Sequence, residues 1–63
     1  MMNVTRAQQA AQTIAEVVEL ASFKDVGASA LCAKDLCATL GIDTSMVLAL
    51  VSDELLAHPD FNL

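Results

Sequence analysis

Apolar residues in the first third of the chain recur at alternating three- and four-residue intervals, the spacing of one face of an α-helix. We therefore predict an amphipathic helix over residues 5–22, capped at its start by Asn3 or Thr5. Because many of the apolar positions are Ala, this helix can approach a neighbour closely, in its own domain or in a second copy. The positions with this spacing are Val4, Ala7, Ala11, Ile14, Val18 and Ala21, and Ala10, Val17 and Leu20 widen the stripe.

A second helix is predicted over residues 30–40, with Ser29 as its N-cap and Gly41 directly after its end. The loop before it, residues 23–28, contains Gly27, which is free to adopt a positive φ. Phe23 and Val26 are apolar, and we expect them to tuck under this loop. A short extended stretch in the loop is the alternative.

A third helix is predicted over residues 45–57, capped by Asp43 or Thr44. It ends before Pro59, because the residue that precedes a proline disfavours helical geometry. The tail, residues 58–63, either docks on the core through Phe61 and Leu63, with or without a short strand, or frays. The sequence thus predicts one all-α, three-helix domain over residues 1–63.

The chain is short and rich in apolar residues. Its 63 residues are 56% hydrophobic, above the usual range of about 45–50%. A chain of this size buries only a modest fraction of its surface, and small scaffolds often gain stability by oligomerising. We therefore predict a packed or intertwined homodimer, with a well-packed Ala-rich monomer as the alternative.

Negative charge is concentrated in the second half of the chain. Residues 1–34 contain three basic and three acidic side chains, whereas residues 35–63 contain five acidic side chains and no Lys or Arg. This half repels phosphates and anionic lipid headgroups and attracts a basic protein surface, although the acids also serve simply to keep an apolar chain in solution. The acidic surface is expected at Asp43, Asp53 and Glu54.

Residues 33–51 resemble a helix-turn-helix motif. Leu36-Cys37 supplies the apolar and small residues of the first helix, Leu40-Gly41-Ile42 matches the turn, and Val47 and Leu50 match the buried positions of the second helix. The resemblance implies a two-helix corner, which any tight turn with a small residue and a Gly could also form.

The implied function, DNA binding, fits this segment poorly. In the family, residues at the start of the second helix contact base edges, and basic residues bind phosphates. Here Thr44 and Ser45 are the only polar uncharged residues at that start, they follow Asp43, and no basic residue lies beyond Lys34. We therefore expect nucleic-acid binding to be absent.

The third predicted helix is instead suited to protein contact. It is apolar nearly all round, beginning with the run Met46–Val51, so it should be buried on several sides. We predict that it forms a dimer interface or lines a groove for a partner helix; the alternative is a core helix within one chain. Leu48→Asp would give a folded monomer in the first case and an unfolded chain in the second. The predicted interface residues are Met46, Leu48, Ala49, Val51, Leu55, Ile14 and Val18.

No constellation of residues predicts catalysis, a metal site or a cofactor. His58 lies at a predicted helix end, where capping is its expected role. Cys32 and Cys37 are about 140° apart around a helix and match no zinc pattern, so we expect reduced, packed thiols. Asp53 and Glu54 are adjacent and point in different directions. We predict a non-enzymatic protein.

The function predicted is that of a small acidic regulatory module that binds a protein. In style the chain resembles the small early and accessory proteins of temperate, lambdoid bacteriophages, which would imply a modulator of host or phage development. The alternatives are a helix-turn-helix DNA-binding regulator and an acidic DNA mimic that sequesters a basic, DNA-binding protein. No signal peptide or membrane span is visible, so we expect a cytoplasmic protein, in the host cytoplasm if a phage encodes it.

Overall fold

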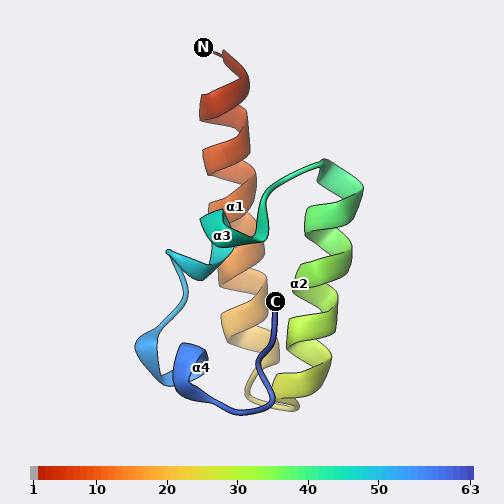
Figure 1. Cartoon of the computed structure of the whole chain (residues 1–63), viewed down its shortest axis with the longest axis vertical. Coiled ribbons are helices and arrows are strands. Elements are labelled where there is room, and N and C mark those ends of the chain that lie inside the picture. The colour runs from red at the N-terminus through yellow and green to blue at the C-terminus, as the bar shows by residue number, and fades with distance from the viewer. Residues whose placement is uncertain (1) are drawn as a thin grey trace.

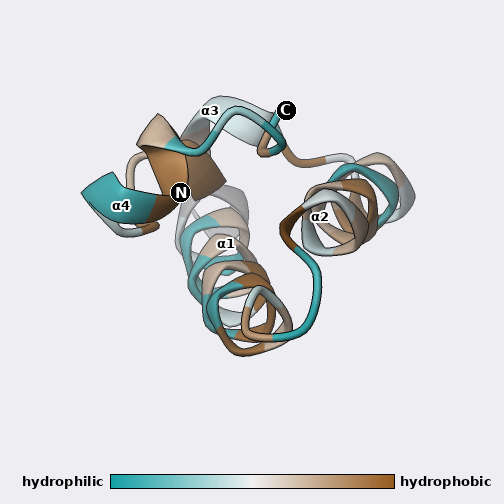
Figure 2. Cartoon of the chain, turned by 90° about the horizontal axis from the view of Figure 1, so that it is seen from below, coloured by the Kyte–Doolittle hydropathy of each residue, from teal (hydrophilic) through white to brown (hydrophobic). Residues whose placement is uncertain are grey.

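The computed structural model describes the backbone of residues 2–63 and the side chains of residues 5–63. Within these residues the chain forms four helices and no strand (Figure 1). The helices are α1 (Met2–Ala21), α2 (Val26–Leu40), α3 (Thr44–Leu48) and α4 (Asp53–Ala57). α1 and α2 run antiparallel, and Figure 2 shows α3, α4 and the C-terminal tail on one side of this pair. The predicted all-α class is confirmed.

The long first helix is confirmed, and it buries the face that the spacing indicated. It begins at Met2, however, so Asn3 and Thr5, the predicted caps, lie inside it. Ala11, Ile14, Ala15 and Val18 lie in the core, with Val18 fully covered. Two of these four residues are Ala, so the neighbouring helices can approach α1 closely.

α2 begins at Val26, four residues earlier than predicted, because Asp25 is its N-cap. The Asp25 Oδ1 atom accepts a hydrogen bond from the Ala28 backbone N at 3.1 Å. Ser29, the predicted cap, lies one turn inside the helix, where its hydroxyl donates to the Val26 carbonyl. The predicted loop over residues 23–28 is therefore wrong in its second half, and Gly27 is helical and has no positive φ.

The end of α2 is as predicted. Gly41 adopts left-handed geometry, with φ 68° and ψ 34°. Its backbone N donates to the Ala38 carbonyl at 3.4 Å, and the Ile42 N donates to the Cys37 carbonyl at 2.9 Å. These two bonds form a Schellman motif, which reverses the chain and satisfies carbonyls at the helix end.

The single helix predicted over residues 45–57 is wrong. α3 ends at Leu48 and a new helix, α4, begins at Asp53, so the segment forms two short helices. Ser52 has extended geometry (φ −67°, ψ 153°), and its hydroxyl accepts from the Leu55 N at 3.3 Å. A Ser in this position starts a new helix and so does not continue the previous one.

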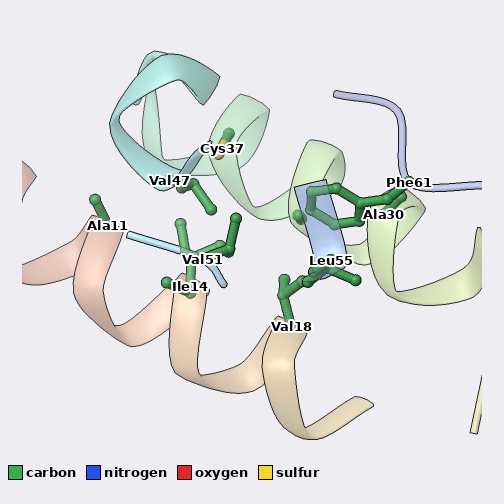
Figure 3. Packing of buried hydrophobic residues seen from close by; sticks show 11 residues of the cluster. Ala11, Ile14, Val18, Ala30, Cys37, Val47, Val51, Leu55 and Phe61 are labelled. Carbon is green, nitrogen blue, oxygen red and sulfur yellow. The ribbon is translucent and has the colours of Figure 1, made fainter. Parts of the chain in front are cut away.

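The last third of the chain completes the core. Figure 3 shows Val47, Val51 and Leu55 directed toward α1, where Ala11, Ile14 and Val18 receive them. Phe61 is buried among the same cluster, and Leu63 packs against it. The tail therefore docks on the core through Phe61 and Leu63, as one of the two predictions for it stated, and it forms no strand.

Candidate protein-interaction surface

Four of the seven predicted interface residues lie inside the chain itself. Ile14, Val18, Val51 and Leu55 are all buried in the core of a single copy. They cannot meet a partner without opening the fold. Their burial accounts for much of the apolar surplus that we assigned to a dimer interface.

The other three predicted interface residues lie at or near α3. Met46 and Leu48 are half-buried and pack against the core, while Ala49 is exposed in the turn after α3. An open hollow lined by Ala11, Met46 and Ala49 lies between α1 and α3. Leu50, which is 48% exposed, also lines this hollow, but the most exposed apolar side chains lie elsewhere.

The two most exposed large apolar side chains lie near the end of α1 and in the turn that follows it. Leu20 is 70% exposed and Phe23 is 87% exposed, and Val17 precedes them on the same side of the helix. We call these three residues the Leu20 surface. Leu20 is nine positions from the buried Ala11, which places it about 180° around the helix from the core.

The turn after α1 keeps the helical path, so Phe23 extends this surface. The Ser22 N donates to the Val18 carbonyl at 2.9 Å, and the Lys24 N donates to the Ala21 carbonyl at 3.1 Å. These are the four- and three-residue spacings of a helix and of its tightened last turn. In Figure 2, hydrophobic residues colour the outer side of α1, which faces away from α3 and α4.

Three open hollows border Leu20. One reaches Leu50, a second reaches Ala28 of α2, and a third passes Phe23 toward Leu55 and His58. The surface is thus a ridge with shallow depressions on each side. Ridges and grooves of this kind are what a packed partner helix requires.

Glu19 holds the neighbouring segment in place. Its Oε1 atom accepts a hydrogen bond from the Ser52 backbone N at 2.5 Å, and its Oε2 accepts from the Ser52 hydroxyl at 3.4 Å. This contact fixes the break between α3 and α4 against α1. It thereby sets Leu50, which is also exposed, beside the hollow next to Leu20.

The predicted acidic residues all lie at starts of helices. Asp43 caps α3, and hydrogen bonds from the Ser45 backbone and side chain lower the pKa of its carboxyl. Asp53 and Glu54 occupy the first turn of α4, where the helix dipole favours negative charge. All three are exposed. Local stabilisation of short helices accounts for their positions.

The remaining reactive groups are arranged as structural residues. Cys37 is buried, and burial, with a smaller effect from Asp43, raises the pKa of its thiol. A raised thiol pKa opposes nucleophilic chemistry. His58 is the C-cap of α4, as predicted, but through its backbone N, which donates to the Leu55 carbonyl at 3.1 Å. Its ring Nδ1 accepts from the Asp60 backbone N at 3.1 Å and so organises the tail. Among residues 5–63, no group of three His, Cys, Asp or Glu side chains could hold a metal ion.

No described helix is both long enough and apolar enough to cross a membrane.

Comparisons with family models, with curated proteins and with solved structures each return no match for this chain.

The Leu20 surface was missed at the level of the sequence, although a signal for it exists. The sequence pattern places Val17 and Leu20 on the flank of the buried stripe and Phe23 under a loop. These placements are wrong, because all three side chains are exposed. Leu20 lies opposite Ala11 and Val18 on a helical projection, so only one of the two faces could be the core of so small a domain. The more regular face, which contains the Ala residues, was therefore predicted to be the core face.

Proposed function

We propose that this chain is a non-catalytic regulatory module that binds a protein through an apolar helix surface. The observation that carries the proposal is the exposure of Leu20 and Phe23, 70% and 87%, on a helix whose opposite face is fully packed. Large apolar side chains exposed together commonly mark a protein-contact site.

Burial of this surface against a partner would contribute favourably to binding. Burying an exposed Leu or Phe side chain contributes about 1.5–3 kcal/mol relative to leaving it in water. Val17 and Leu50 add apolar area at the edges. Phe23 is an aromatic residue on an exposed turn, which suits it to anchor a partner in a pocket.

The proposal moves the binding surface away from α3. The sequence pattern favoured the apolar run Met46–Val51, but two of its members, Val47 and Val51, are buried and two others are half-buried. The predicted mode, contact through an apolar helix face, is retained. Its location becomes the C-terminal part of α1 and the following turn.

Site-specific photo-crosslinking tests this proposal in the source cell. A photoreactive phenylalanine analogue at position 23 should form covalent adducts with protein, because that side chain would lie at the contact. The same analogue at Thr39, an exposed residue near the end of α2, is the matched control. Equal labelling at both positions, or no protein adduct at position 23, would contradict the proposal.

A further inference from the structure

We propose that the partner at the Leu20 surface is a second copy of this chain, whose α1 packs antiparallel across it about a two-fold axis at Leu20. The inference rests on the proposed function, because it names the occupant of that surface. It differs from the homodimer expected from the sequence, which used α3 and residues now found in the core.

The apolar residues of the surface are arranged symmetrically about Leu20. Val17 lies three residues before it and Phe23 three residues after it. In an antiparallel pair of helices centred on Leu20, residues at equal distances before and after the centre lie level with one another. Val17 of one copy therefore lies level with Phe23 of the other, and the two Leu20 side chains meet at the axis. A two-fold interface requires this self-complementarity.

The charged residues at the edge follow the same symmetry. Glu16 lies four residues before Leu20, and Lys24 lies four residues after it. Both side chains are exposed. The antiparallel pair brings Glu16 of each copy level with Lys24 of the other, which gives two attractive pairs per dimer. A parallel pair would instead set Glu16 beside Glu16 and Lys24 beside Lys24, so charge selects the antiparallel arrangement.

The other exposed apolar residues lack such a pattern. Leu31 on α2 is 63% exposed, but Ala28 and Lys34 lie three residues away on its two sides. An antiparallel pair about Leu31 would set a lysine level with an alanine and leave its charge without a partner. Leu40 is followed directly by Gly41, where the helix ends. Self-complementarity is therefore a property of the Leu20 surface among these three sites.

The second copy would pack on the outer side of α1. The break between α3 and α4 and the start of α4 would lie beside it, because open hollows lead from Leu20 to Leu50 and from Phe23 to Ser52 and His58. One helix face is smaller than a standard protein interface, so we expect a reversible dimer with a dissociation constant weaker than about 1 µM.

Sedimentation equilibrium across a concentration series tests the inference on the full chain. The unmodified protein should convert from monomer to dimer as concentration rises. Leu20→Glu sets two like charges at the axis and removes the central apolar contact, so the dissociation constant should rise at least about thirtyfold. Leu31→Glu, at a Leu on α2 that is 63% exposed, is the matched control and should leave the dissociation constant unchanged within about twofold. Circular dichroism should show full helicity in both variants.

Charge exchange provides a second test that is specific to self-association. Glu16→Lys and Lys24→Glu should each raise the dissociation constant by about threefold to thirtyfold, because each turns two attractive pairs into repulsive ones. The double variant should recover the original value. An equimolar mixture of the two single variants should form heterodimers more tightly than either variant forms homodimers, since every cross-pair is then of opposite charge.

The outcomes separate this inference from the proposed function. A chain that stays monomeric at millimolar concentration overturns the inference, as does a dimer that Leu31→Glu disrupts and Leu20→Glu leaves intact. If position 23 still crosslinks to a different protein, the interaction module stands and only its occupant is wrong. If position 23 yields neither a self-adduct nor a foreign adduct, both proposals fail.

Discussion

The two faces of α1 use apolar residues in opposite ways. The inner face combines two small residues, Ala11 and Ala15, with Ile14 and Val18, and all four are buried. The outer face carries Leu20, and the turn that continues it carries Phe23, both exposed to solvent. Burial in this helix therefore follows position and close packing, and size alone does not predict it. The large residues that the core does not use are available to another molecule.

The sharpest way to break this comparison is to place the same charge on each face. Val18→Glu buries a carboxylate where the native side chain is fully covered, and should cost about 4 kcal/mol in the free energy of unfolding. A domain of this size rarely has more than about 3–5 kcal/mol of stability, so this variant should be unfolded. Leu20→Glu, measured in dilute monomer, should change the free energy of unfolding by less than about 0.5 kcal/mol. Urea denaturation followed by circular dichroism provides both values, and comparable losses would show that the outer face also supports the monomer.

A smaller loss in the free energy of unfolding is expected at Glu19, which lies between the inner and outer faces of α1. Glu19→Ala removes the acceptor for the Ser52 backbone N and hydroxyl, and should cost about 1–2 kcal/mol. Glu16→Ala is the matched control, since its side chain is exposed on the outer side, and should stay within about 0.5 kcal/mol. Thermal or urea unfolding of dilute protein measures both. A loss at Glu16 as large as that at Glu19 would remove the special role of the contact with Ser52.

The smallest expected effect concerns the two thiols of α2, of which Cys37 is buried and Cys32 is half-buried. Burial raises the pKa of the Cys37 thiol in the folded state, whereas the unfolded chain ionises near the ordinary thiol value of about 8.5. The contribution of this thiol to stability is therefore complete below that pH and is lost as the pH rises through the folded-state pKa. Alkylation by iodoacetamide at pH 8 should modify the half-buried Cys32 before Cys37. Equal rates, measured by mass spectrometry of the intact protein, would mean that Cys37 is as accessible as Cys32.

Much of the helical framework was predictable because its signals are local. The spacing of apolar residues indicated α1, and Leu40-Gly41-Ile42 indicated the end of α2. The boundary errors arose where two local signals compete. Gly27 favours a turn, but the cap at Asp25 lets it begin a helix. Ser52 followed by Asp53 and Glu54 is a typical helix start, yet the continuous apolar pattern around it favoured one longer helix.

The candidate site was less predictable because it depends on contacts between distant residues. Hydropathy alone does not distinguish Leu20 from Leu55, although one lies in solvent and the other in the core. That division follows from which side of α1 receives the last third of the chain. The hydrogen bonds from Ser52 to Glu19 join residues 33 positions apart and have no local signature.

The contact between Glu19 and Ser52 also bears on which part of the fold opens first. The segment from Ser52 to Leu63 has one short helix and few backbone hydrogen bonds of its own, so its amides should exchange with solvent sooner than those in the middle of α1. The Glu19 carboxylate holds this segment against α1 through its hydrogen bonds with Ser52, and its sequence neighbour Leu20 is the centre of the Leu20 surface. A change in the backbone of α1 at Leu20 would therefore also move Glu19, which holds the C-terminal segment against α1.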